Sequence, residues 1–236
     1  AITDSCNIFF YDVGRRLGIA ALTQWATRFG LGKATGIELS GESRGVVAGP
    51  SYTASLGETW YEGNTLSAAI GQENNRFTPL QLASFLATLV NGGNRWQTHL
   101  LQAVHAADGT LLHRQEPVLL DHIDLNPIYV EAVKAGMAGV TESASQARYF
   151  ADLPVRVGAK TGSAQVTGKK EANAVYLCFA PYEKPEIALA LVVEQGGSGS
   201  ELGAIAADIL KAYFPPPPEE TVQATAGEAI PPAEAP

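Results

Sequence analysis

Two short motifs in this 236-residue chain combine side chains that suit acyl-group chemistry. The first is Ser5-Cys6-Asn7, and the second is Lys160-Thr161-Gly162 followed by Ser163. A fixed ammonium group can bind a carboxylate and bias nearby hydroxyls toward releasing protons. The lysine motif lies on a predicted strand and the serine motif lies where helices begin, which is the context that a serine acyl-transfer signature requires.

Each motif also has a plainer interpretation. A Lys-Thr-Gly tripeptide arises by chance in many chains, where it is a strand leading into a turn with one exposed lysine. Ser5 and Asn7 have the side chains of helix caps. Only the two motifs together therefore indicate a site.

Helical patterns dominate the first half of the chain. Residues 5–29 have helical spacing with a break expected near Gly18. Residues 36–50 are rich in Gly and Ser and predict an extended surface connection. The capping pattern Thr78-Pro79-Leu80-Gln81 predicts the start of a helix that ends at Asn91-Gly92-Gly93.

Two further elements follow this helix. Asp108-Gly109 is a strong turn signal and predicts a hairpin over residues 100–114. Asn126-Pro127 repeats the device of a cap followed by proline and predicts a helix through about Val140.

The last third of the chain predicts an antiparallel sheet. Residues 155–166, 174–182 and 187–195 are strand-like runs joined by short turns. A final helix should place one apolar stripe against the sheet, formed by Leu202, Ile205, Ala206, Ile209, Leu210 and Tyr213. The whole pattern predicts an α+β fold with a domain over residues 1–214. The Pro-, Ala- and Glu-rich tail over residues 215–236 should be disordered.

Composition excludes several function classes. The net charge of -8, with scattered basic residues, argues against a nucleic-acid partner. Cys6 and Cys178 lack the spacing of a metal site, so we expect no metal and no cofactor. Because the chain starts at Ala1 and its one methionine is Met137, we expect a fragment or a processed chain.

Several ordered segments resemble the transpeptidase domain of class B penicillin-binding proteins. The resemblance covers nearly all of residues 1–214 and rests on SCNIFFYDVGRRLG, FGLGKATGIELSGESRG, LSAAIGQENNRFTPLQLASFLATLVNGG, VGAKTGSAQ and VVEQGGSGSELGAIAADILKAYF. It implies an incomplete domain of the fold shared by penicillin-binding proteins and serine β-lactamases, in which a helical region joins an antiparallel sheet with the C-terminal helix packed on it. It also implies a D,D-transpeptidase that cross-links peptidoglycan.

The resemblance implies a role for each motif residue. Lys160 and Thr161 would hold the terminal carboxylate of a D-alanyl-D-alanine stem peptide, and Gly162 would let the substrate backbone approach the strand. The family pattern makes the Ser163 N–H an oxyanion donor. From the opposite wall of the site, Ser5 would pass a proton to the leaving amine and Asn7 would hydrogen-bond the substrate backbone.

The nucleophile of this family lies in Ser-x-x-Lys, and no such motif occurs in the chain. The positions three residues before its seven lysines hold no serine: Gly30, Glu131, Val157, Val166, Thr167, Pro181 and Asp208. We therefore expect that the chain alone is inactive and that an absent upstream segment carries the nucleophile. A smaller departure is Gln72-Glu73, where the family more often has Gln-Gly.

Other activities fit the same motifs. A class D-type β-lactamase or β-lactam sensor uses the same motif set, and a non-catalytic penicillin-binding-like module would bind only peptidoglycan or partner proteins. The resemblance further implies β-lactam antibiotics and a glycosyltransferase as partners. It places the parent protein at the extracytoplasmic face of the bacterial cytoplasmic membrane, held by an anchor outside this sequence.

Overall fold

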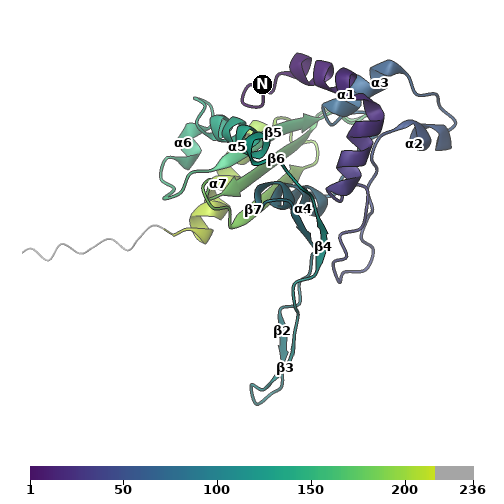
Figure 1. Ribbon diagram of the computed structural model, residues 1–236. Helices are drawn as coiled ribbons and strands as arrows, with labels where there is room; N and C mark the ends of the chain where they lie inside the picture. Colours follow the sequence, from purple (N-terminus) through teal and green to yellow (C-terminus); the bar gives the residue numbers. More distant parts are fainter. Residues whose placement is uncertain (216–236) are drawn as a thin grey trace, which may run out of the picture.

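The centre of the fold is a three-stranded antiparallel sheet. The computed structural model describes residues 1–215, in which β5 (Gly158–Ala164), β6 (Asn173–Ala180) and β7 (Ile187–Val193) form a meander in the order β5-β6-β7 (Figure 1). Lys160 pairs with Leu177 in the register of β5 and β6. The predicted sheet is confirmed, although each strand is shorter than its apolar run. In this order β5 is an edge strand.

The remaining elements cover the sheet or extend from it. In chain order they are α1 (Asn7–Arg28), α2 (Pro50–Ser55), α3 (Glu62–Ala69), α4 (Pro79–Val90), β1 (Asn94–Trp96), β2 (Ala103–His105), β3 (Leu111–Arg114), β4 (Leu119–His122), α5 (Pro127–Thr141), α6 (Ala147–Phe150), the 3-10 helix η1 (Gly199–Glu201) and α7 (Leu202–Tyr213). None of the helices described is both long enough and apolar enough to cross a membrane. The predicted disordered tail, apart from Pro215, lies outside the described residues.

The sheet separates two apolar clusters because alternate strand residues point to opposite faces. One face packs against α7 and the end of α5, with the buried residues Val140, Val157, Ala159, Ala174, Tyr176, Cys178, Ala180, Leu202, Ala206 and Leu210. The other face packs against α4 and α5, with the buried residues Leu86, Met137, Ala138, Phe179 and Tyr182. The structure is thus an α+β fold, as predicted, and helices cover both faces of its sheet.

The C-terminal helix packs on a narrower stripe than the sequence predicts. Leu202, Ala206 and Leu210 are buried, but Ile205, Ile209 and Tyr213 are 48%, 37% and 51% exposed. The buried face instead includes two further small residues, Gly203 and Ala207. Small side chains let the helix axis approach the sheet closely, so the helix rotates toward them and away from the bulky positions. The predicted stripe was therefore wrong at three of its six positions.

The predicted break in the first helix is confirmed. Gly18 has φ 74° and ψ 160° inside α1, a conformation open to glycine because it has no Cβ. The first half of α1 packs against α3, where a Cβ added at Gly14 would lie 2.3 Å from the Cβ of Ala69. The kink therefore redirects α1 after the half that packs against α3.

The capping box of α4 is present as predicted and has a second function in the fold. Thr78 accepts from the Gln81 N–H at 3.1 Å, and the Gln81 side chain accepts from the Thr78 N–H at 2.9 Å. The buried Gln81 amide also donates to the Lys33 and Arg44 carbonyls at 2.6 and 2.8 Å. One side chain therefore holds the start of α4 and the connection over residues 33–44 together.

We expect Gln81→Leu to lower the free energy of unfolding by about 2–4 kcal/mol, because it removes three hydrogen bonds from backbone groups at a buried site. Urea unfolding followed by circular dichroism measures the loss. Gln24→Leu, at an exposed position of α1, is the matched control and should change stability by no more than about 0.5 kcal/mol. Equal effects of the two substitutions would contradict the assigned role of Gln81.

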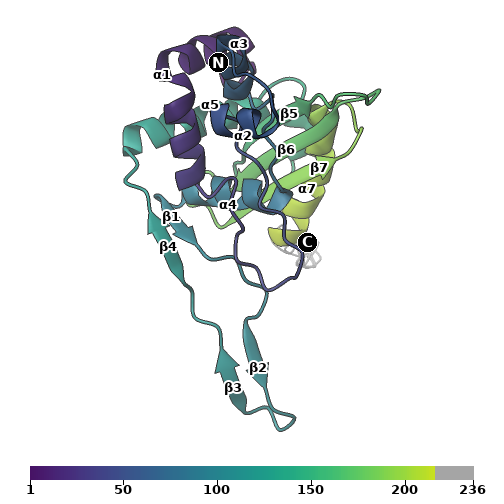
Figure 2. The same cartoon turned by 90° about the vertical axis from the view of Figure 1, so that its right-hand side faces the viewer.

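The predicted hairpin and the helix after it are both present. β2 and β3 pair across a turn at Asp108-Gly109, with Gly109 at φ 87°, and β1 pairs with β4 closer to the body. These pairs form a ribbon that projects away from the sheet (Figure 2). The Asn126 side chain caps α5 by accepting from the Ile128 N–H at 3.0 Å.

Candidate active site

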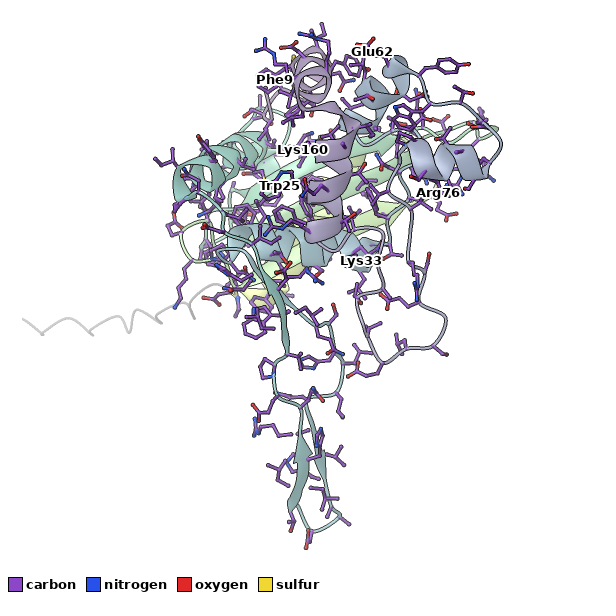
Figure 3. The ribbon with its side chains drawn as sticks, turned by 45° about the vertical axis from the view of Figure 1, so that its right-hand side comes forward. Phe9, Trp25, Lys33, Glu62, Arg76 and Lys160 are labelled. Atoms are coloured by element: carbon purple, nitrogen blue, oxygen red, sulfur yellow. The ribbon has the colours of Figure 1, made fainter. Side chains whose placement is uncertain are left out.

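The structure brings the two chemical motifs together although 155 positions separate them. Lys160 is half-buried on β5 (Figure 3). Its ammonium group donates a hydrogen bond to the Ser5 hydroxyl. It also donates to the carbonyl oxygen of Thr161 at 2.7 Å. Burial lowers the pKa of the Lys160 amine from that of an exposed lysine. The sequence indicated both motifs, and the fold supplies the contact between them.

Ser5 and Asn7 do not act as side-chain caps of α1. The N-cap position is Cys6, without a side-chain hydrogen bond, and Asn7 is the first helical residue and is exposed. Ser5 has φ 49°, an uncommon left-handed conformation for a residue with a side chain, and its hydroxyl faces Lys160. The helix-cap interpretation of these residues is therefore wrong for the described structure.

The N-terminal segment owes its position to two glycines of α5 that sequence reasoning missed. A Cβ at Gly136 would lie 2.9 Å from the Cβ of Ile2, and a Cβ at Gly139 would lie 2.6 Å from the Thr3 hydroxyl oxygen. The Thr3 hydroxyl donates to the Gly136 carbonyl at 3.0 Å. The absence of two side chains on α5 thus lets residues 1–5 approach closely enough to bring Ser5 to Lys160.

The free edge of β5 presents backbone groups to the same region. The Thr161 carbonyl accepts from Lys160, and the Ser163 carbonyl accepts from the Gln72 side chain at 3.4 Å. These partners lie outside β6, and the N–H and C=O of one residue point to the same side of an antiparallel strand. The N–H groups of Thr161 and Ser163 therefore point to the open edge, where a ligand can accept from them.

The side chains of β5 divide between the two faces. Gly162 lies on the face of Lys160, and a Cβ there would make only an ordinary 3.4 Å contact with the Val175 Cβ, so glycine keeps this surface open. Ser163 lies on the other face, where its hydroxyl accepts from the Gly199 N–H at 3.3 Å. The side chain of Thr161 points to the face opposite Lys160. Its hydroxyl can therefore reach a ligand beside Lys160 only by extending around the strand edge.

Gly199 and Gln72 are further residues that shape this edge. A Cβ at Gly199 would lie 2.2 Å from the Gly162 carbonyl oxygen and 2.4 Å from the Val175 carbonyl oxygen, so only glycine lets η1 rest on the strands. Gln72 precedes Glu73, which has φ 65°. The family resemblance predicted glycine at position 73, and glycine adopts this conformation without strain. The presence of glutamate instead of glycine at position 73 was the one feature of the sequence that drew attention to Gln72.

This combination of fold and site is characteristic of one group of proteins. An α+β fold with a lysine on the edge strand, facing a serine hydroxyl before the first helix, is the arrangement of the penicillin-binding proteins and the serine β-lactamases.

Comparisons with known proteins narrow this class. Residues 1–213 match the family model for the penicillin binding protein transpeptidase domain. The chain is 33% identical over 228 residues to the peptidoglycan D,D-transpeptidase MrdA of Escherichia coli, covering 89% of this chain and 36% of that protein. It is 32% identical over 181 residues to penicillin-binding protein 2A of Bacillus subtilis, covering 71% of this chain and 24% of that protein. The chain therefore spans about a third or less of these relatives.

Solved structures agree with this assignment. Pseudomonas aeruginosa PBP2, in complex with WCK 5153, has a TM-score of 0.78 and 31% identity, covering 90% of this chain and 48% of that one. Helicobacter pylori PBP2, in complex with MreC, has a TM-score of 0.75 and 27% identity, covering 91% of this chain and 39% of that one. The chain belongs to the penicillin-binding protein transpeptidase domain family, and the resemblance to class B members is confirmed.

Proposed function

We propose that this chain forms part of a peptidoglycan D,D-transpeptidase that works through a serine acyl-enzyme and reacts covalently with β-lactams. The contact between Lys160 and Ser5, beside a strand edge with a free Ser163 N–H, is the observation that carries the proposal. In this proposal Lys160 is a cation, Ser5 a proton-carrying hydroxyl and the Ser163 N–H an oxyanion donor around one open surface. These are three of the groups that acyl transfer needs.

The site residues divide the first chemical step among them. A serine hydroxyl from outside this sequence gives its proton to the lysine of the same Ser-x-x-Lys motif and attacks the carbonyl carbon of the penultimate D-alanine. The Ser163 N–H stabilises the oxyanion that forms. The amide C–N bond then breaks, an ester forms, and Ser5 delivers the proton to the departing amine. Lys160 and Thr161 hold the terminal carboxylate of the leaving D-alanine, and Gly162 and Asn7 align the peptide backbone.

The second step completes the cross-link. The amine of a second stem peptide attacks the ester carbonyl. The amide forms as the ester C–O bond breaks, and the proton lost by the amine returns to the serine oxygen. The same oxyanion donor acts in both steps because both pass through a tetrahedral intermediate.

Labelling with a fluorescent penicillin tests this function. The 236 residues alone should show no covalent label, because they contain no Ser-x-x-Lys, whereas the chain extended upstream by its natural coding sequence should be labelled stoichiometrically. Denaturing gels measure both results. Replacing the serine of an upstream Ser-x-x-Lys by alanine is the control and should abolish the label. Labelling of the 236 residues, or none of the extended chain, would contradict the proposal.

The relatives also suggest the setting of the whole protein. H. pylori PBP2 has been solved with MreC, and a further match, with a TM-score of 0.75 and 30% identity, comes from a peptidoglycan synthase complex. We therefore propose that the protein works at the extracytoplasmic face of the bacterial cytoplasmic membrane. Its partner there would be a glycosyltransferase that polymerises the strands to be cross-linked.

A further inference from the structure

A buried glutamine just before α6 connects η1 with the sheet. Gln146 is only 2% exposed, although glutamine is mostly a surface residue. It occupies the N-cap position of α6 but makes no side-chain capping bond there. Its side-chain amide instead donates to the Ser200 carbonyl at 3.0 Å, and its side-chain oxygen accepts from the Tyr176 hydroxyl at 3.3 Å. One side chain therefore joins η1 to β6.

The two partners fix the orientation of this amide. A carbonyl oxygen can only accept, so the Ser200 carbonyl requires the NH2 group of Gln146, and the amide oxygen is left to face Tyr176. Burial raises the pKa of the Tyr176 hydroxyl, which therefore keeps its proton and acts as the donor. Both ends of the Gln146 amide are thus satisfied in one arrangement only.

The packing around Gln146 leaves its side chain little freedom. A Cβ at Gly203, in the first turn of α7, would lie 2.2 Å from the Gln146 side-chain oxygen, so α7 has room for this glutamine only because position 203 is glycine. Tyr176 is fully buried and pairs with Thr161 across β5 and β6. A buried polar connection whose groups are all paired is rigid.

The same 3-10 helix also contacts the strand that carries the proposed oxyanion donor. The Gly199 N–H donates to the Ser163 hydroxyl at 3.3 Å, and a Cβ at Gly199 would lie 2.2 Å from the Gly162 carbonyl oxygen. The Ser163 hydroxyl and the Ser163 N–H belong to one residue. A displacement of η1 therefore acts directly on the residue whose N–H faces the open edge of β5.

We propose that Gln146 is a positioning residue for the oxyanion donor of the site. It holds η1 at a fixed distance from β5, and η1 in turn fixes the backbone of Gly162 and Ser163. Gln146 itself touches neither the substrate nor the reacting atoms. Its contribution comes from preorganisation, because an oxyanion donor lowers the barrier only if it already points to the developing charge. The inference rests on the proposed function, which assigns the Ser163 N–H its role.

Acylation kinetics with a fluorescent penicillin test the inference in the upstream-extended protein. Varying the penicillin concentration separates the dissociation constant of the non-covalent complex from the rate constant of acylation within it. Gln146→Met keeps a side chain of similar length and removes both hydrogen bonds. It should lower the acylation rate constant about tenfold, whereas the dissociation constant, which depends on Lys160, should change by less than about twofold.

Gln81→Met is the matched control. It makes the same substitution at another buried glutamine with several hydrogen bonds, which holds the start of α4 instead of η1. It should reduce the folded fraction, measured by thermal unfolding, and leave the acylation rate constant of the folded molecules unchanged. This comparison separates positioning of the oxyanion donor from a general loss of stability.

Two further variants follow the connection on either side of Gln146. Tyr176→Phe removes a single hydroxyl and should lower the acylation rate constant about threefold, which keeps the inference testable if Gln146→Met does not fold. In protein that already carries Ser163→Ala, the hydroxyl contact with Gly199 is absent. Adding Gln146→Met to that protein should lower the rate constant by less than about threefold.

Each result either supports or contradicts the inference. An acylation rate constant that Gln146→Met and Tyr176→Phe leave unchanged would overturn it. An equal loss in Gln81→Met, or an undiminished effect of Gln146→Met beside Ser163→Ala, would do the same. All three results would leave the transpeptidase assignment intact. Wild-type protein that takes up no penicillin would instead overturn the proposed function, on which the inference depends.

Discussion

Lys160→Ala should slow acylation of the upstream-extended protein by fluorescent penicillin about 10- to 100-fold. The ammonium group of Lys160 contacts the Ser5 hydroxyl and is the cation that we assign to the substrate carboxylate. A charge-assisted hydrogen bond contributes ~1.5–3 kcal/mol, which corresponds to this range of rates. Stopped-flow or gel-based labelling measures the second-order rate constant. An unchanged rate would contradict the role of Lys160.

Changes in the ligand can distinguish the loss of carboxylate recognition from a general disturbance of the protein structure. A penicillin whose carboxylate is masked as a methyl ester should react slowly with the wild-type protein, but Lys160→Ala should slow it little further, because the interaction is already absent. Lys184→Ala, in an exposed turn, should leave the acylation rate with both ligands unchanged.

A double substitution tests whether Ser5 and Lys160 act together. Ser5→Ala combined with Lys160→Ala should reduce the acylation rate by less than the product of the two single reductions, since the two groups are in contact.

Gly199→Ala should reduce acylation about tenfold or more and also destabilise the protein. The added Cβ would lie 2.2 Å from the Gly162 carbonyl oxygen and 2.4 Å from that of Val175, and backbone atoms cannot move away cheaply. Overpacking of this kind costs about 1–3 kcal/mol. Either η1 separates from β5, which removes the hydrogen bond to Ser163, or β5 itself shifts. A displacement of about 1 Å at a reacting centre can cost up to 100-fold in rate.

Gly63→Ala is the matched control for Gly199→Ala. Gly63 lies in α3 with no atom within 4 Å of an added Cβ, so alanine there should preserve the rate and stabilise the helix slightly. Thermal unfolding reports the stability of each variant, and the acylation rate is normalised to the folded fraction. If Gly199→Ala changed neither the thermal stability nor the acylation rate more than Gly63→Ala does, the contact of η1 with the strand would not contribute to function.

Local sequence patterns predicted most elements of this fold. Thr78 with Gln81 and the Asp108-Gly109 turn each act through neighbouring residues, so their structural meaning can be read from a few positions. The kink at Gly18 was likewise a local property of one residue. The orientation of α7 was not local, because Ile205 and Ala206 are both apolar and only packing against the sheet decides that Ala206 is buried while the bulkier Ile205 is 48% exposed.

The chemical groups of the candidate site, namely Ser5, Asn7 and the Lys160–Ser163 motif, could be predicted from the sequence because residue identity defines side-chain chemistry. The contact of Ser5 with Lys160 and the orientation of the Ser163 N–H toward the open edge could be seen only in the folded chain. These relations depend on close approaches over long sequence separations, which glycines at positions 136, 139 and 199 permit. A glycine in the sequence does not reveal which segment will pack against it, so the positioning of the site could not be predicted before the fold was known.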